Sequence, residues 1–379
     1  MRLPSHLALS LFYLTWFLFL GVYLPYFNLH LEHLGFTGLQ IGVVSALLPL
    51  CMVIIPTAGG MLADRLGKRR GLVILSTWLG MIAFSMLLGA RGFPGVAIGV
   101  TVFAILRAPA LPLVDATAME LSERGGPPYG RMRAWGSVAF ILAALGCGKL
   151  IGLWGDRAVL HAALVALGLN ALGSILLPGD RIRTPATRVG TDLRETLSRP
   201  RALLFLGACV LSQASHGPYY VFFSIHLERN GYQPQEIGLL WALAVTCEIV
   251  AMLKMPAVLQ RHGTLATLTL SLMLAAVRWA VCAGATTLAP LILAQMLHAA
   301  TFAAFHVAAV THTHRLFGEA QRASGQAIYS SATFGLGNVL GMVLSGVFHA
   351  RLGVPGLFWG AALTAVLGAI FVFLAGRRE

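Results

Sequence analysis

Charged and titratable side chains inside otherwise apolar stretches are the residues of this chain best suited to bind an ion or to move a proton. Asp115 lies just over one helical turn inside the end of an apolar stretch, and Arg133 lies about one turn inside the next. Because their depths agree, the two side chains can pair. Glu248, Arg278 and His298 fall near the middles of later stretches. A charge in a membrane span is energetically expensive, so each of these residues is a candidate for substrate binding or proton transfer.

Other polar residues in the apolar stretches carry weaker signals. Arg107 stands before Pro109 in a proline-interrupted stretch, where it can line a cavity or bond carbonyl groups that the proline frees. His306, His312 and His314 do not share one face of a helix, and the cysteines have no metal-ligand spacing. We therefore predict no metal site and no catalytic residues.

The elements that position these residues are apolar runs long enough to cross a membrane. Of the 379 residues, 57% are hydrophobic and 11% are charged, whereas a soluble domain has about 25% charged residues. A span needs about 20 apolar residues, and its backbone groups must be satisfied internally, which makes it a helix. We predict an all-α membrane protein with twelve transmembrane helices. The expected spans are 7–28, 39–62, 71–90, 95–119, 131–153, 158–177, 202–226, 236–258, 264–285, 288–314, 324–349 and 355–375.

The second half of the chain repeats the first. Residues 219–238 reproduce Tyr, Phe, His, Leu, Glu and Gly of residues 23–42 in register. Such a repeat indicates two pseudo-symmetric six-helix bundles in parallel orientation. The predicted division is an N-terminal bundle at 1–178, a cytoplasmic linker at 179–200 with a short helix at 190–198, and a C-terminal bundle at 201–379.

The basic residues are unevenly distributed between alternate loops. The net charge of +13 would by itself be compatible with nucleic-acid binding. However, most of the 27 Lys and Arg residues fall on the side that holds both termini. The few on the other side are Arg91, Lys149, Arg157, Arg229 and Arg351. This bias places both termini in the cytoplasm, and it indicates a lipid bilayer, and no nucleic acid, as the partner.

One cytoplasmic turn, residues 60–72, has the sequence GMLADRLGKRRGL. Its glycines permit close backbone approach and a tight reversal, and its basic residues hold the turn on the cytoplasmic side. The spacing resembles the signature loop of the major facilitator superfamily of transporters. The resemblance implies a gating motif made of Gly60, Asp64, Arg65, Gly67, Lys68 and Arg69, with Arg131 in the same gate. We expect Asp64 to interact with the cytoplasmic end of span eleven and to stabilise the outward-open state.

Three further segments resemble the phenylpropionate-permease-like branch, which is related to the lactose permease. They are YGRMRAWGS at 129–137, IGLLWALAVTCEI at 237–249 and HAATFAAFHVAAV at 298–310. The resemblance implies a substrate site made of Asp115, Arg133, Phe140, Glu248, Arg278 and His298. Two positions depart from the lactose permease. Phe140 replaces the tryptophan on which the sugar stacks, and Thr301 replaces the proton-carrying glutamate, so lactose is not expected and the proton carrier must be reassigned.

These resemblances predict a proton-coupled symporter that imports a small organic solute, such as 3-phenylpropionate, by alternating access. Arg133 and Arg278 are expected to clamp its carboxylate. Burial favours the neutral form of a carboxyl group, so Glu248 is the favoured proton carrier, with Asp115 as the alternative and His298 as helper. The other functions considered are a proton-antiport exporter of drugs or metabolites and a sugar or nucleoside symporter.

A membrane enzyme is disfavoured because the chain has no nucleotide motif, metal cluster or soluble domain. We expect no cofactor other than the proton gradient, with protons and a small solute as ligands. The protein is expected to be a monomer in the bacterial inner membrane.

Overall fold

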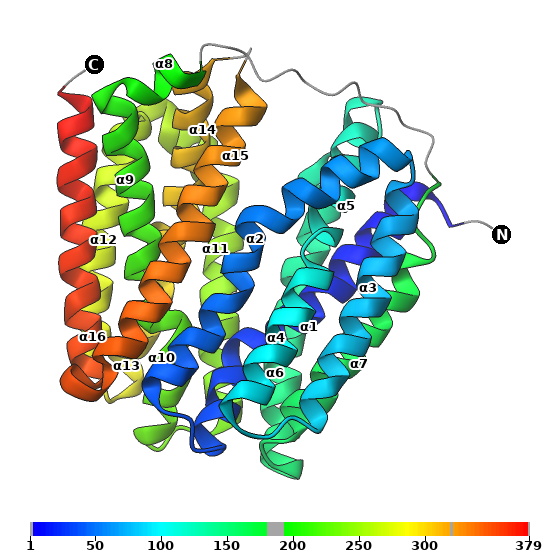
Figure 1. The fold of residues 1–379 in the computed structure, drawn as a ribbon. Helices are drawn as coiled ribbons and strands as arrows, with labels where there is room; N and C mark the ends of the chain where they lie inside the picture. The colour runs from blue at the N-terminus through cyan, green and yellow to red at the C-terminus, as the bar shows by residue number, and fades with distance from the viewer. Residues whose placement is uncertain (1–2, 180–192, 319–320, 378–379) are drawn as a thin grey trace. The chain divides into compact units, whose positions relative to one another are not determined.

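The computed structural model describes residues 3–179, 193–318 and 321–377, and these residues contain helices and no strand (Figure 1). The α-helices are α1 Ser5–His33, α2 Gly38–Leu66, α3 Arg69–Ser85, α4 Gly92–Arg107, α5 Ala110–Glu123, α6 Tyr129–Trp154, α7 Ala158–Ser174, α8 Leu193–Ser198, α9 Pro200–Ser215, α10 Gly217–Arg229, α11 Pro234–His262, α12 Thr264–Gly284, α13 Leu288–His298, α14 Phe305–Phe317, α15 Arg322–Ser330 and α16 Asn338–Gly376. The remaining segments are the 3-10 turn η1 (Met86–Leu88) and the π-helical segments η2 (Ala299–Ala304) and η3 (Ser331–Gly337).

The predicted set of twelve transmembrane helices is confirmed. Among the described residues, nine stretches are long and apolar enough to cross a membrane. The stretch that ends with α16 supplies two crossings, because the backbone leaves helical geometry at Gly353, with φ 61°. The other two crossings are α7, a shorter apolar helix, and the pair α9 and α10, which is interrupted at His216.

Several spans are broken in the middle, as the prolines in the sequence suggest. The break between α4 and α5 falls at Ala108 and Pro109, because proline has no N–H to continue the helical ladder. The hydroxyl of Ser76 on α3 donates a hydrogen bond to the carbonyl of Leu106. This bond gives a partner to a backbone carbonyl next to the break. Interrupted helices of this kind are common at the binding sites of transporters.

The chain divides into two compact units. Unit 1 comprises residues 1–40, 50–186 and 231–242, and unit 2 comprises residues 41–49, 187–230 and 243–379. The predicted boundaries at 178 and 201 stay a prediction. Most of the predicted linker, residues 180–192, lies outside the described residues, while the helix expected at 190–198 corresponds to α8.

Each unit is a bundle of packed helices (Figure 1). In unit 1, α1 runs along α6 and α7, and α3 runs along α4 and α7. Phe12, Tyr13 and Trp16 of α1 are fully buried in this core. In unit 2, α16 packs along α9 and α12. A side chain added at Gly217 would collide with the backbone of Gly341, so glycine permits the close approach of α10 and α16.

Candidate functional site

Arg278 on α12 is the centre of a buried polar cluster in unit 2. Its side chain is 0% exposed. Its Nε donates to the carbonyl of Ala294 at 2.8 Å, and its Nη2 donates to Oε1 of Gln295 at 3.2 Å. Its Nη1 donates to Nδ1 of His298 at 2.9 Å and to Oγ1 of Thr301 at 3.2 Å. All four acceptors belong to uncharged groups, so the positive charge is held by dipoles.

Two aromatic rings complete the surroundings of Arg278. The guanidinium carbon lies 4.4 Å from the ring centre of Tyr219 and 4.3 Å from that of Trp279. An aromatic face attracts a cation, most strongly when both are desolvated. The Tyr219 hydroxyl also donates to Oε1 of Gln295 at 3.3 Å, which fixes the amide that faces the arginine.

The bond from Arg278 determines the protonation pattern of His298. A guanidinium can only donate, so Nδ1 of His298 must be the acceptor. The ring is therefore neutral, with its proton on Nε2. That nitrogen lies 3.7 Å from Oε2 of Glu248 on α11. Arg278, His298 and Glu248, which the sequence analysis placed in one site on three different spans, thus form one chain of contacts.

The π-helical segment η2 follows His298, and three aromatic rings form a column along it. The rings of His298 and Phe302 stack at 5.2 Å with an angle of 11°, and those of Phe302 and His306 at 6.4 Å with an angle of 13°. These rings stand four residues apart, and positions four apart lie on one face of a helix. His306 also shares a 3.0 Å hydrogen bond with the Tyr329 hydroxyl. The column was not predicted from the sequence, because Phe302 carries no charge that would mark it as a candidate.

Asp115 on α5 belongs to a second polar cluster, in unit 1. Its Oδ1 accepts hydrogen bonds from the hydroxyls of Tyr13 at 2.7 Å and Tyr129 at 3.1 Å. The guanidinium of Arg133 lies over the Phe17 ring at 3.9 Å. No ion pair joins Asp115 and Arg133 in the described residues, so the expected direct pair is wrong for this conformation. The two tyrosines, whose role the sequence did not reveal, bind Oδ1 of Asp115, while the Arg133 guanidinium lies over the Phe17 ring.

Two further residues of unit 1 are buried. Phe140 on α6 is 6% exposed, so its ring is part of the core. Arg107, at the end of α4, is 3% exposed and lies over the Trp16 ring at 3.6 Å and the Phe19 ring at 4.5 Å. Its Nη2 reaches the carbonyl of Trp16 at 3.5 Å, while its Nη1 has no hydrogen-bond partner among the described residues. Cation–π contacts therefore hold this charge, rather than the carbonyls freed by Pro109.

Comparisons with known proteins agree with this architecture. The sequence model of the MFS_1 like family matches residues 6–359. A protein of Escherichia coli (strain K12) named as a probable 3-phenylpropionic acid transporter is 31% identical over 387 residues, which cover 98% of each chain. The chain belongs to the major facilitator superfamily of transporters. The maltose permease of Geobacillus stearothermophilus is 24% identical over 97% of this chain and 94% of its own length.

A solved structure of a major facilitator, the nucleoside transporter NupG, superposes with a TM-score of 0.87. At 18% identity, with 99% of this chain and 100% of that chain covered, the likeness shows the fold alone. As a member of the superfamily, the chain is a transporter and not an enzyme. Its membrane-spanning helices and bacterial relatives make it a multi-pass inner-membrane protein.

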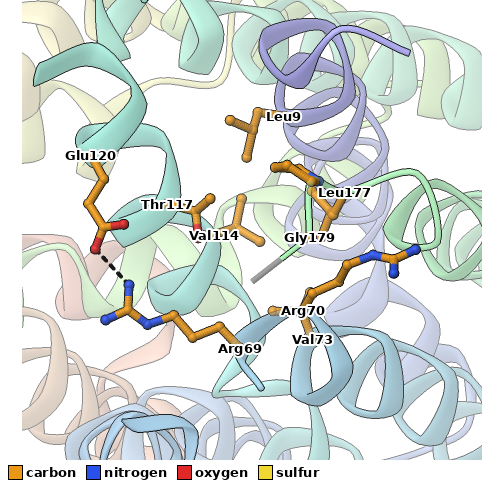
Figure 2. Close-up of a pocket in the computed structure, with 10 residues that line it drawn as sticks. Leu9, Arg69, Arg70, Val73, Val114, Thr117, Glu120, Leu177 and Gly179 are labelled. Carbon is orange, nitrogen blue, oxygen red and sulfur yellow. Dashed lines mark hydrogen bonds and ion pairs between the residues drawn. The ribbon is translucent and has the colours of Figure 1, made fainter. Parts of the chain in front are cut away.

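The signature loop of the superfamily is built around Arg69 at the start of α3. Nη1 of Arg69 pairs with Oε1 of Glu120 at 2.6 Å, and Nη2 pairs with Oδ1 of Asp64 at 3.2 Å. Figure 2 shows Arg69 reaching across to Glu120 on α5. Arg70 donates to the carbonyl of Ile175 at 2.7 Å. Glu120 lies one residue beyond the predicted end of span four, so the sequence did not mark it as an intramembrane charge.

The other residues of the predicted gate have simpler positions. Gly67 ends α2 in the left-handed conformation, with φ 63°, which glycine adopts without strain. A side chain at Gly60 would meet no atom within 4 Å. Arg65, Lys68 and Arg131 are exposed. The contact expected between Asp64 and span eleven stays a prediction.

Proposed function

We propose that this transporter is a proton-coupled symporter that imports a small organic acid, with an aryl carboxylate such as 3-phenylpropionate as the solute. The observation that carries the proposal is the chain Arg278–His298–Glu248 in unit 2. It places one carboxylate, one neutral imidazole and one permanent cation in sequence inside a membrane protein. Such intramembrane groups are typical of proton relays.

Glu248 is the proton carrier in this proposal. Its side chain is 19% exposed, whereas that of His298 is 7% exposed, so the carboxylate is the more accessible of the two. A proton on Nδ1 of His298 would break the bond from Arg278, while a proton on Glu248 would leave that bond intact. Glu248 can therefore exchange its proton with the least rearrangement, and the Nε2–H of His298 is a polar neighbour 3.7 Å away.

Arg133 is the proposed anchor for the carboxylate of the solute. It is half-buried, and in the described residues no acid lies within ion-pair distance of it. A guanidinium matches a carboxylate with two parallel hydrogen bonds, and the neighbouring rings of Phe17 and Tyr13 offer apolar contact. Arg278 is less suited to this role in the present conformation, because each of its nitrogens already donates a hydrogen bond. An Arg133–Arg278 clamp would require release of His298.

The name of the E. coli relative supports an aromatic acid as solute. A sugar symporter is the second candidate, because the maltose permease relative covers nearly the whole chain. The proposal also includes cytoplasmic termini, action as a monomer by alternating access, and the proton gradient as the only energy source. Efflux by proton antiport remains the other candidate, in which the solute and the proton move in opposite directions.

The test is transport into proteoliposomes with an imposed proton gradient. Radiolabelled 3-phenylpropionate and maltose are compared in parallel for the wild type, Glu248→Gln and the control Glu123→Gln, which alters an exposed acid at the end of α5. Glu248→Gln should abolish gradient-driven accumulation but retain exchange of labelled for unlabelled solute. Normal accumulation by Glu248→Gln would exclude Glu248 as the proton carrier and assign that role to Asp115. Accumulation of maltose but not of 3-phenylpropionate would identify a sugar symporter instead. Gradient-driven efflux of the solute would identify a proton-antiport exporter.

A further inference from the structure

A groove of about 630 Å³ runs along the surface of unit 1 between α6 and α7, with α1 as its floor. Small side chains such as Ala143 and Ala162 on the two facing helices leave the space open, and Leu18 and Val22 of α1 close it below. Val165 on its rim is 64% exposed. The lining is apolar except at one end, where Arg157 and His161 lie.

The length of the groove corresponds to one leaflet of a bilayer. Its lining extends from Ala143 to Trp154 on α6 and from Ala158 to Leu169 on α7. At 1.5 Å per residue each stretch covers roughly 16 Å, and half of the hydrocarbon core is about 15 Å. The groove therefore has the length of a single acyl chain. With both termini cytoplasmic, as proposed above, it lies in the outer leaflet.

The polar end of the groove has the chemistry of a headgroup site. Arg157 is exposed and has no acidic partner in the described part of the chain. The neighbouring Asp156 pairs instead with His30, with 2.8 Å between Oδ2 and Nδ1. Nδ1 of His161 is used on the carbonyl of Arg157 at 3.0 Å, which leaves Nε2 for a ligand. Trp154, which is 73% exposed at the same end, is of the type that accumulates at membrane interfaces.

We propose that this groove binds one anionic phospholipid, with an acyl chain between α6 and α7 and the phosphate on Arg157. A guanidinium pairs well with a phosphate, and a hydroxyl of a glycerol headgroup can donate to Nε2 of His161. Arg157 is one of the few basic residues on the side of the membrane where such residues are scarce. The site is independent of the transported solute.

The test uses the full chain in detergent, titrated with dioleoyl phosphatidylglycerol and with dioleoyl phosphatidylcholine, which has the same acyl chains. Native mass spectrometry counts the bound lipid, and the rise in unfolding temperature gives its affinity. The wild type should retain one phosphatidylglycerol and bind it more tightly than phosphatidylcholine. Arg157→Gln should weaken phosphatidylglycerol binding about fivefold, the weight of one arginine near an anionic lipid. Arg91→Gln, at another exposed basic residue of unit 1 outside the groove, should leave it unchanged.

A second variant tests the acyl chain. Ala162→Phe fills the groove and should weaken binding of both lipids, and its unfolding temperature without lipid shows whether it is folded. Glycerophosphoglycerol, which has the headgroup without the chains, should not raise the unfolding temperature. Equal binding of the two lipids by the wild type, unchanged binding in Arg157→Gln, or unchanged binding in a folded Ala162→Phe would each overturn the proposal. So would full stabilisation by glycerophosphoglycerol. If the wild type binds phosphatidylglycerol as expected but does not accumulate 3-phenylpropionate, only the proposed function is contradicted.

Discussion

Replacing His298 with asparagine or with glutamine separates the contributions of its two ring nitrogens. The amide oxygen of asparagine falls where Nδ1 stands, so His298→Asn keeps an acceptor for Arg278 and loses the Nε2–H beside Glu248. Glutamine places its amide nitrogen near the Nε2 position, so His298→Gln keeps a donor for Glu248 and removes the acceptor of the 2.9 Å bond from Arg278. Both variants lose the stack on Phe302, so that loss cancels in the comparison.

The difference in stability follows from the bond to Arg278. A hydrogen bond to a charged group contributes about 1.5–3 kcal/mol, and a buried donor left without a partner costs a similar amount. Because Arg278 is 0% exposed, no bulk water replaces the lost acceptor. His298→Gln should therefore be less stable than His298→Asn by about 1.5–3 kcal/mol, which lowers the unfolding temperature by several degrees.

The transport readout should show the opposite order. His298→Asn should fold well yet accumulate solute poorly under a proton gradient, because Glu248 has lost the N–H group that lies 3.7 Å from it. Thermal unfolding of the purified variants and gradient-driven uptake in proteoliposomes provide the two measurements. Equal stability of the two variants would refute the assignment of Nδ1 as acceptor, and wild-type accumulation by His298→Asn would refute the role of Nε2.

Three other substitutions test the remaining clusters. Asp64→Asn removes the charge that pairs with Arg69 at 3.2 Å but leaves the Glu120 pair, so transport should slow while membrane insertion stays normal; normal transport at equal expression would remove Asp64 from the gate. Arg133→Lys should weaken solute binding about tenfold or more, because lysine loses the two-pronged geometry, and a dissociation constant equal to wild type in a direct binding assay would exclude Arg133 as the anchor. Tyr13→Phe removes the 2.7 Å bond to Asp115 and should lower the free energy of unfolding by about 1–3 kcal/mol; unchanged denaturant unfolding would show that the bond contributes nothing.

The predicted fold was confirmed because membrane topology is determined locally. Each span is a run of apolar residues whose backbone bonds close within the run, so composition and length suffice to locate it. The break before Pro109 was also visible, because a missing N–H is a property of one residue. The signature turn could likewise be recognised from its spacing, and Gly67 has the left-handed conformation that such a turn needs.

The sequence by itself therefore determined the helices, the superfamily and the set of intramembrane charges. It brought Glu248, Arg278 and His298 forward as candidates because a charge in an apolar run is costly wherever it points. It did not determine the partners of these charges. The tyrosine hydroxyl on Asp115 and the neutral form of His298 depend on the distances between residues on different helices. Only the tertiary structure decided them, because hydrogen bonds act over about 3 Å and depend on direction, which spacing along a helix does not specify.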